Sequence, residues 1–242
     1  MFTGITRGTF PVVAVERRPG LLRYTVELSP ELAQGAAIGA SVSIDGVCQT
    51  IAELTAPPGD AANDPPRRLT FDAIAETLDK TTLGELEVGS RVSVERSLRA
   101  GDEIGGHEVA GHVVGTGVLG AREERGGELA LRIDVPREWS KYLLHKGFVA
   151  VDGSSLTVGE VFSNRSASGN ADAEAAEEGT AATASFWIHL IPETLRLTNL
   201  GRKQVGDRVN VELDARTVAL VDTVERLVEP LVARQVERAL SG

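Results

Sequence analysis

The chain contains an internal repeat. Residues 76–95 (ETLDKTTLGELEVGSRVSVE) and residues 193–212 (ETLRLTNLGRKQVGDRVNVE) carry the same amino acid at 12 of 20 positions, at a constant offset of 117. Upstream, residues 43–51 (SIDGVCQTI) correspond to residues 150–158 (AVDGSSLTV) at an offset of 107. A unit of about a hundred residues is longer than the repeats of solenoid proteins, so it predicts a duplicated domain. The duplication offers two similar pockets that can each hold a molecule of the same ligand.

Length and composition fit two domains. The chain has 242 residues, and an apolar content of 42% is enough for packed cores. We expect one repeat domain at residues 1–100, a second at residues 101–215 and a tail at residues 216–242. A net charge of −10 argues against non-specific binding to nucleic acid or to an anionic membrane, because both repel an acidic surface.

Cysteine usage and the first residues indicate a compartment. Cys48 is the single cysteine, so no disulfide can form within the chain, and a reducing environment fits best. The opening residues MFTGITRGTF have no cationic start followed by an apolar run, so no signal peptide is visible. No stretch approaches the roughly 18 apolar residues that a membrane span needs. We expect a cytoplasmic protein without a membrane partner.

Most readable segments are short and strand-like. They are rich in β-branched residues and are separated by Gly, Pro, Asp or Asn, as in residues 12–15, 24–28, 91–95, 129–135, 186–191 and 208–213. This pattern predicts an all-β fold of two small antiparallel barrels, which remove exposed sheet edges by closing. Each repeat also carries one short helix signal, which starts at Glu76 or Glu193 and is expected to end at Gly84 or Gly201.

Three segments depart from the strand pattern. Ala56 to Arg68 is Pro-rich, and Ser163 to Ser185 is small, polar and acidic; we expect both to be flexible hairpin tips. Thr217 to Leu240 has a helical apolar stripe at Val221, Val224, Val228 and Leu231. Pro230 is expected to break or kink this helix near Val228 and to leave two shorter helices.

Two equivalent strands carry reactive side chains. Asp45-Gly46 and Asp152-Gly153 predict turns. After each turn, side chains alternate, so Cys48 and Thr50 share one strand face, as do Ser155 and Thr157. A pair of this kind can serve catalysis, although a buried Cys or Ser more often serves packing.

His107 and Lys146 are further candidates. His107 and His112 are five residues apart and do not match the His-Glu-x-x-His pattern, so no zinc site is expected. His107 follows two glycines and can take part in proton transfer, or its ring can be bonded to a local backbone group. Lys146 can supply positive charge to a ligand or be a surface residue. The absence of a Walker loop and of a dinucleotide-binding glycine motif excludes a doubly wound nicotinamide enzyme.

With these residues assembled, the chain resembles the riboflavin synthase family of the two-barrel type. The resemblance covers almost the whole chain and rests on the motifs MFTGI, SIDGVCQT, FDAIAETL, VSVERSL, DEIGGH, GHVVGTG, YLLHKGFVAVDGSSLTVGEV, HLIPETLRLTNLG and VNVELD. It implies two tandem Greek-key closed barrels and a C-terminal helix, assembled as a homotrimer. The implied site lies between the N-terminal barrel of one subunit and the C-terminal barrel of its neighbour.

The resemblance also implies a reaction. Two molecules of 6,7-dimethyl-8-ribityllumazine dismutate into riboflavin and 5-amino-6-ribitylaminouracil by transfer of a four-carbon unit, without metal or cofactor. Association with lumazine synthase is a further implied partner. The family motifs place substrate-binding residues in two pockets. In the N-terminal barrel these are Gly4, Ile5, Thr6, Ser41, Cys48, Gln49, Thr50, Asp72, Ala73, Ile74, Ala75, Glu76 and Thr77. In the C-terminal barrel they are Gly106, His107, Lys146, Ser155, Leu156, Thr157, His189, Leu190, Ile191, Pro192, Glu193 and Thr194, and Phe2 and Asp214 also match site positions.

Individual catalytic roles are hypotheses at this point. We expect His107 and Asp214 to manage protons, and Cys48 and Ser155 to assist nucleophile addition or water activation at the ring. Two ligands held face to face would make the reaction effectively intramolecular. The chain departs from the family pattern at Gln49, Ser154, Val114 and Glu108, and these departures bear on pocket shape.

Two other functions fit the same motifs. One is a non-catalytic lumazine- or flavin-binding protein on the same fold, in which one site is usually degenerate. Here Lys146, Ser155, Thr157, His107 and Asp214 are all present, which favours the enzyme. The other is a flavin-dependent reductase, for whose nicotinamide domain the chain has no room.

Overall fold

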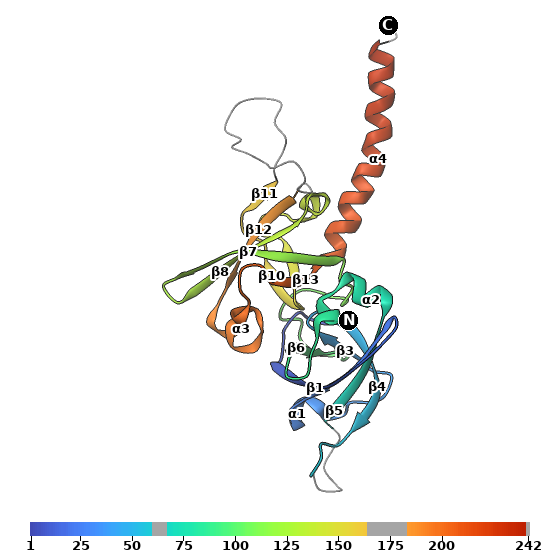
Figure 1. Ribbon diagram of the computed structural model, residues 1–242. Coiled ribbons are helices and arrows are strands. Elements are labelled where there is room, and N and C mark those ends of the chain that lie inside the picture. Colours follow the sequence, from blue (N-terminus) through green and yellow to red (C-terminus); the bar gives the residue numbers. More distant parts are fainter. Residues whose placement is uncertain (60–66, 164–182, 241–242) are drawn as a thin grey trace.

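The first half of the chain folds into a closed six-stranded barrel (Figure 1). The computed structural model describes residues 1–59, 67–163 and 183–240. The barrel order is β1-β2-β5-β4-β3-β6, and β6 pairs with β1 to close it. Its strands are β1 (Thr9–Arg18), β2 (Leu21–Glu27), β3 (Ser41–Ile44), β4 (Val47–Thr55), β5 (Arg68–Ile74) and β6 (Arg91–Arg96). The all-β prediction is confirmed, and a single helical turn, α1 (Pro30–Ala33), joins β2 to β3.

The second half repeats this order with one strand divided. Its sheet runs β10-β9-β13-β7-β8-β12-β11. Together β10 and β11 take the place of β4, and between them Gly159 donates to the carbonyl of Trp187 (2.7 Å) and Trp187 donates to that of Glu160 (2.9 Å). The β10–β11 segment therefore connects β9 to β12, as β4 connects β3 to β5, and the strands have the same cyclic order as in the first barrel. The strands are β7 (Gly115–Arg125), β8 (Glu128–Pro136), β9 (Phe148–Val151), β10 (Ser154–Thr157), β11 (Val161–Ser163), β12 (Thr183–Leu190) and β13 (Arg208–Leu213).

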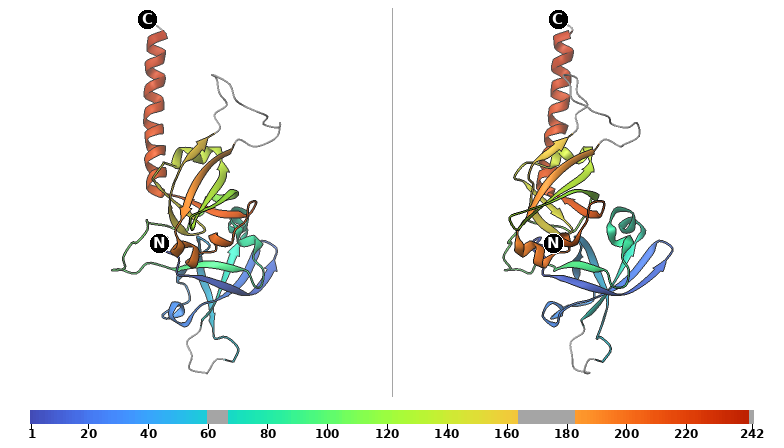
Figure 2. Two further views of the ribbon diagram at one scale, coloured as in Figure 1. Left: turned by 90° about the vertical axis from the view of Figure 1, so that its left-hand side faces the viewer. Right: turned by 60° about the vertical axis from the view of Figure 1, so that its left-hand side comes forward.

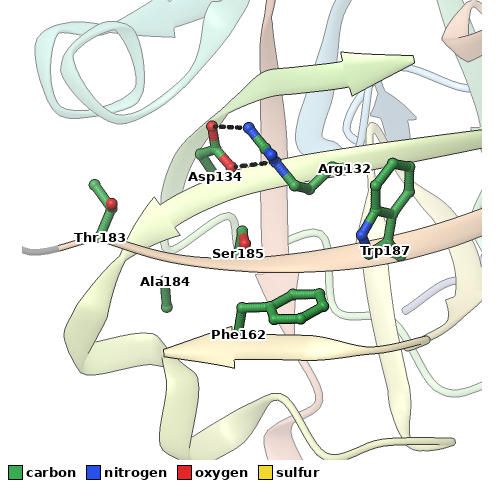
Figure 3. A pocket seen from close by; sticks show the side chains of 7 residues that line it. All are labelled: Arg132, Asp134, Phe162, Thr183, Ala184, Ser185 and Trp187. Atoms are coloured by element: carbon green, nitrogen blue, oxygen red, sulfur yellow. Dashed lines mark hydrogen bonds and ion pairs between the residues drawn. The ribbon is translucent and has the colours of Figure 1, made fainter. Parts of the chain in front are cut away.

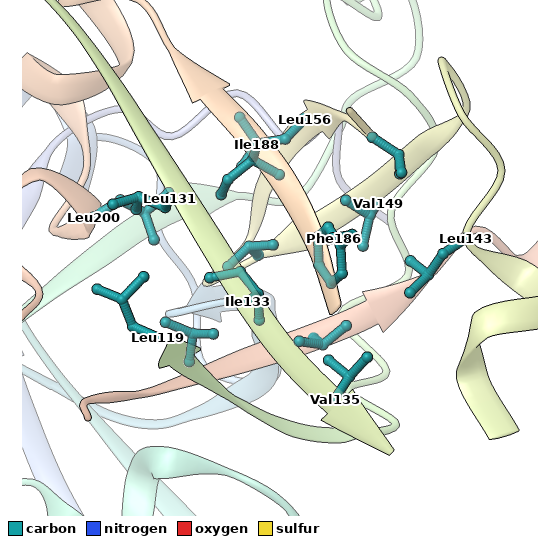
Figure 4. Packing of buried hydrophobic residues seen from close by; sticks show 14 of the residues in the cluster. Leu119, Leu131, Ile133, Val135, Leu143, Val149, Leu156, Phe186, Ile188 and Leu200 are labelled. Atoms are coloured by element: carbon teal, nitrogen blue, oxygen red, sulfur yellow. The ribbon is translucent and has the colours of Figure 1, made fainter. Parts of the chain in front are cut away.

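Each barrel encloses its own apolar core. Inward positions alternate with outward ones, as in β8, where every second residue from Leu129 to Val135 is buried. Figure 4 shows Leu131, Ile133 and Phe186 interdigitating in the second core. Burying each such side chain contributes about 1.5–3 kcal/mol, so the alternation fixes the strand register.

The helix predicted in each repeat is present but is shorter than expected. α2 (Ala75–Lys80) and α3 (Pro192–Leu197) stop before the glycines, so the prediction that they end at Gly84 and Gly201 was wrong. The next residue, Thr81 or Thr198, is extended, and its hydroxyl donates to the carbonyl four residues earlier at 2.7 or 2.8 Å. The glycines lie in the 3₁₀ turns that follow, η1 (Thr82–Glu85) and η3 (Leu200–Arg202); a third, η2 (Arg137–Tyr142), precedes β9.

The tail is one helix, α4 (Ala215–Leu240), which projects from the second barrel (Figures 1 and 2). The prediction of two shorter helices was wrong, because α4 continues through Pro230. Proline removes one backbone donor, but the helix assignment is unbroken on both sides of the exposed Pro230. The predicted stripe is open to solvent in the single chain: Val224, Val228 and Leu231 are exposed.

Two predicted loops are only partly visible. Residues 60–66 of the Pro-rich segment and residues 164–182 of the acidic segment lie outside the described residues. Their flanking strands pair as hairpin arms, β4 with β5 and β11 with β12. Within the described ranges, none of the helices combines the length and the apolar character needed to cross a membrane.

The two barrels meet at an approximate twofold axis. Phe2 and Val109, which occupy equivalent places in the repeat, form an antiparallel bridge with hydrogen bonds of 2.7 and 3.0 Å. The N-terminus accordingly lies at the level of the junction between the barrels (Figure 2). Both residues are 1% exposed and pack with Ala150 in a small cluster of their own. This cluster seals the junction.

The two Asp-Gly turns pack against each other at this junction. Asp45 and Asp152 have φ of 45° and 44°, and the glycines that follow have φ of 83° and 79°, so both predicted turns are confirmed. A Cβ on Gly46 would lie 2.5 Å from the nitrogen of Gly153, and one on Gly153 would lie 2.7 Å from that of Gly46. The two backbones touch, and glycine is needed on both sides.

Buried acids occupy the same junction. Asp45 is 6% exposed and Asp152 is 1% exposed. The Asp45 carboxylate accepts bonds from the backbone N–H of Ser93 (2.7 Å) and the side chain of Asn199 (2.8 Å). Burial, followed by the nearby Asp152 charge, raises the pKa of Asp45 to about 8. Lys203 lies 3.7 Å from Asp152 and is the cation that faces the pair.

This raised pKa predicts that stability depends on pH. The folded protein holds the Asp45 proton more tightly than the unfolded chain does, since the pKa rises from 3.8 to about 8. The contribution of this group is therefore complete below pH 3.8 and is lost as pH rises through about 8, at up to about 1.4 kcal/mol per pH unit. We expect Asp45→Asn to flatten the decline in urea-unfolding free energy between pH 5 and 9, whereas the surface variant Asp79→Asn should follow wild type. Parallel wild-type and Asp45→Asn curves would contradict the prediction.

Candidate active sites on two equivalent strands

β4 and β10 present the predicted reactive side chains on their outer faces. On β4, Val47 and Gln49 point inward and are buried, while Thr50 is exposed. On β10, Ser155 is partly buried and Thr157 is exposed. Each site therefore lies on the outside of a barrel, where a flat ligand can approach both side chains and backbone groups.

Each of these strands is covered by a segment from the other half of the chain. Gly4 accepts a hydrogen bond from the backbone N–H of Ser155 (2.8 Å), and Gly111 accepts one from Cys48 (2.9 Å). This corrects the predicted grouping, because Gly4, Ile5 and Thr6 were expected beside Cys48. After Phe2 the chain crosses to the second barrel. The equivalent segment of the second repeat crosses in the opposite direction and brings Gly111 to the first barrel.

His107 and Ser155 form the best-defined polar contact at the second site. Nδ1 of His107 lies 2.6 Å from Oγ of Ser155, and His107 is 8% exposed. Burial lowers the pKa of His107 below 6.5, and the negative charge of Asp214 only partly opposes this. The imidazole is therefore neutral at neutral pH and can accept a proton.

Asp214 has a structural task as well as an electrostatic one. Its carboxylate accepts bonds from the backbone N–H (2.9 Å) and the hydroxyl (2.6 Å) of Thr217, and so caps the first turn of α4. Partial burial works to raise the pKa of Asp214, but the bonds from Thr217, helped by the His107 charge, outweigh it and lower the pKa. Asp214 stays ionised, so the geometry gives it the part of a fixed charge and not of a proton carrier.

Cys48 lies at a hollow of about 510 Å³. Met1, His112 and Asp214 are among its lining residues, with Arg216 at the rim in an ion pair with Glu108 (2.7 Å). Sequence reasoning noticed His112 only as a failed zinc ligand. The position of His112 at this hollow can be recognised only when the segment after His107 is known to lie against β4.

The remaining predicted residues fall into two groups. Those on outward faces are open to a ligand: Asp72, Ile74, Ala75, Glu76 and Thr77 at the end of β5, His189, Ile191, Pro192, Glu193 and Thr194 at the end of β12, and Ser41 on β3. Four others point into a barrel core, so only their backbone can reach a ligand: Gln49, Ala73, Leu156 and Leu190. Lys146 is exposed in a turn with φ of 65°.

The departures from the family pattern have local explanations. The buried Gln49 side chain accepts a bond from the hydroxyl of Tyr24 (3.3 Å), which is fully buried inside the first barrel. The hydroxyl of Ser154 lies 3.2 Å from that of Thr6 across the junction. Both side chains are therefore buried and bonded within the protein. Val114 is half exposed and nothing in the structure explains it.

Phe148 is a site residue that sequence reasoning missed. It pairs with Thr157 across β9 and β10, is 47% exposed, and stacks on His107 with ring centroids 5.0 Å apart and planes 15° apart. The offset of 107 makes it the counterpart of Ser41, and this comparison could have drawn attention to it.

A separate hollow of about 400 Å³ lies on the outer face of β8, β11 and β12 (Figure 3). Trp187 and Phe162 flank it, and Arg132 pairs with Asp134 at 3.0 Å. Its described lining contains none of the predicted site residues. In the described ranges, His, Cys, Asp and Glu side chains form no group of three or more that could hold a metal ion.

Comparison with known proteins identifies relatives over nearly the whole chain. The lumazine binding domain model matches twice, at residues 3–97 and 110–214. Riboflavin synthase from Escherichia coli (strain K12) is 38% identical over 237 residues, which cover 97% of this chain and 95% of that protein. Riboflavin synthase from Chlamydia pneumoniae is 36% identical over 94% of this chain and 96% of that protein.

Solved structures of a more distant relative share the fold. LumP complexed with riboflavin aligns with a TM-score of 0.70 and 20% identity, over 88% of this chain and 100% of that one. LumP complexed with 6,7-dimethyl-8-(1'-D-ribityl) lumazine aligns with a TM-score of 0.65 and 22% identity, over 88% and 98%.

The crossing glycines yield a stability prediction. A Cβ on Gly4 would lie 2.5 Å from Cβ of Ser155, and one on Gly111 would lie 2.7 Å from Cβ of Cys48; both have positive φ. We expect Gly4→Ala and Gly111→Ala each to lower the unfolding free energy by about 2–5 kcal/mol, from backbone strain plus overpacking. Gly89→Ala is the matched control, because its φ is +95° but nothing lies within 4 Å. Equal losses in urea unfolding for all three would refute the close contact.

Proposed function

The chain belongs to the riboflavin synthase family, and on this premise we propose that it converts two molecules of 6,7-dimethyl-8-ribityllumazine into riboflavin and 5-amino-6-ribitylaminouracil. The observation that carries the proposal is the pair of equivalent outer strands, one with Cys48 and one with the His107–Ser155 contact. Two related sites suit a reaction that consumes two copies of one substrate. A four-carbon unit leaves one lumazine and joins the other.

We assign the following parts to the residues of the second site. Neutral His107 removes a proton from the acidic 7-methyl group of a bound lumazine, either directly or through Ser155, whose hydroxyl is 2.6 Å away. Asp214 stabilises the imidazolium that forms, since its charge acts on His107. The exposed Thr157 on β10 contacts the ring edge. Cys48 at the first site assists nucleophile addition to the ring of the second lumazine.

Each site is open on one side in the single chain, and a facing surface would complete it. We propose that the facing surface is the other barrel of a second subunit, in a homotrimer. The exposed apolar face of α4 supports this assembly: Leu220 is 64% exposed and Leu227 is 62% exposed, although a monomer in water buries such a row where it can. Holding two lumazines face to face between subunits supplies the proximity that the reaction needs.

The proposal extends to location and partners. A single cysteine and the acidic composition fit a cytoplasmic protein. Association with lumazine synthase is consistent with the chemistry, because that enzyme's product would be the substrate of this one. Co-purification of the two proteins from one cell extract tests the association.

The alternative is a lumazine- or flavin-binding protein without turnover. The two solved LumP complexes show that this fold binds such ligands in a relative. One assay separates the functions: purified protein is incubated with dimethylribityllumazine alone and riboflavin is measured. Formation of riboflavin supports the enzyme, and tight binding without product supports the alternative.

A histidine pair tests the catalytic part of the proposal. We expect His107→Gln to lower kcat by about 10²-fold or more, the usual contribution of a general base. Wild-type activity should fall as pH drops through the His107 pKa, below 6.5, because the neutral form is required, and the variant should lose this limb. His145→Gln is the control, since the His145 ring bonds the backbone of Gly159 (2.8 Å) and not Ser155. An unchanged rate and profile in His107→Gln would remove His107 from the mechanism.

A substitution on α4 tests the assembly. Leu227→Glu places a charge on the apolar face and should convert the trimer to monomer and abolish most turnover. Arg226→Glu, a neighbouring exposed position, should leave both unchanged. Analytical ultracentrifugation gives the mass, and the lumazine assay gives the activity. A fully active monomeric Leu227→Glu variant would show that the subunit interface is not needed for the site.

A further inference from the structure

Phe148 is the first residue of β9, and burial in the core does not explain why this position carries an aromatic side chain. It follows the Lys146–Gly147 turn, and its ring is 47% exposed although the next three residues are buried. On one side it pairs with Thr157 of β10. On the other side, β9 pairs with β13 as far as Leu213 and Val149. Phe148 thus contacts two predicted residues of the second site, Thr157 and His107.

The ring of Phe148 limits the movement of His107. His107 belongs to a segment without regular structure that follows two glycines, so its backbone alone leaves the imidazole free to turn. Two contacts oppose that freedom: Nδ1 lies 2.6 Å from Ser155, and the near-parallel Phe148 ring lies 5.0 Å away. A hydrogen bond fixes one atom of a ring, whereas stacking fixes its plane, so the two together define the orientation.

The internal repeat supplies a comparison within one chain. Ser41 occupies the place of Phe148 in the first half, where it pairs with Thr50 as Phe148 pairs with Thr157. A histidine also lies at the first site, because His112 lines the hollow at Cys48, but among the described residues no aromatic ring is stacked on it. The stacked pair of an aromatic ring and a histidine therefore distinguishes the second site from the first within the described residues.

We propose that Phe148 is a positioning residue, which holds the His107 imidazole in the plane that directs it to Ser155 and to the substrate. The inference rests on the proposed function for its effect on catalysis, while the stacking itself belongs to the unliganded protein. Removal of the ring both frees the imidazole and admits water to it. The charge of Asp214 acts on His107, and the Asp214 carboxylate is held by its bonds to Thr217, which a change at Phe148 leaves in place.

The test compares Phe148→Leu with two matched variants. Phe148→Tyr keeps a ring that can stack. Phe162→Leu removes another half-exposed phenylalanine from the same barrel, since Phe162 is 49% exposed and lies on β11, away from His107. NMR titration of the His107 ring in the unliganded protein is the first readout. In Phe148→Leu its pKa should rise toward 6.5, because burial holds it lower in the native protein, and both controls should keep the native value.

Turnover gives the second readout. We expect Phe148→Leu to lower kcat by about tenfold or more with little change in KM, and Phe148→Tyr to restore most of it. On a His107→Gln background the same change should have almost no further effect on kcat, because a residue that acts through His107 has nothing left to position. A purely structural role would lower both backgrounds equally.

Besides an equal loss in both backgrounds, three results would overturn the proposal. One is an unchanged His107 titration in Phe148→Leu, and another is an equal effect of Phe162→Leu. The third is a rise in KM with unchanged kcat, which would make Phe148 a ligand contact instead. A protein that produces no riboflavin would defeat the proposed function but leave the titration result standing, so the two failures can be told apart.

Discussion

The exchange of segments between the two barrels is the constraint on which the rest of the structure depends. Phe2 and Val109 bridge at the approximate twofold axis, and the residues after them continue onto the opposite barrel. Each outer strand is therefore completed by a segment from the other half of the chain. Neither site would have its shape in an isolated repeat, because Gly4 and Gly111 each lie against the reactive strand of the other barrel.

Carboxyl groups are also buried at this junction, where an unpaired charge would destabilise the fold, and hydrogen-bond donors of the crossing segments compensate for their burial. Glu95 and Glu212, equivalent in the repeat, each accept a backbone N–H from the crossing segment, at Thr3 and Ala110 (both 2.7 Å). Burial raises the pKa of both carboxyl groups, and these bonds oppose the rise. A buried carboxylate without such donors would destabilise the fold, so the acids also specify how the segments cross.

Sequence reasoning predicts the scaffold well and the site less completely, for physical reasons. Strand alternation and Asp-Gly turns are local signals, and they lead to two barrels and to the strand faces that Cys48 shares with Thr50 and Ser155 shares with Thr157. The crossing of Gly4 to the second barrel is a tertiary event, and local patterns carry no trace of it. Phe148 reads as one more apolar strand residue until its contact with His107 is seen. The sequence prediction at Pro230 was wrong because the helix-breaking penalty of proline refers to an isolated helix, whereas α4 is continuous on both sides of Pro230.

The duplication also explains which positions stay the same and which differ. Gly46 and Gly153 touch each other across the axis, so a side chain on either one would clash with the other copy, and both remain glycine. The outward positions do not lie against their own counterparts among the described residues: Cys48 corresponds to Ser155 in the alignment of the repeats, and Ser41 corresponds to Phe148. These positions can change in one half without a compensating change in the other. A symmetric scaffold thereby supports two unequal sites, and inequality is what a reaction requires when one of two identical molecules gives a four-carbon unit and the other receives it.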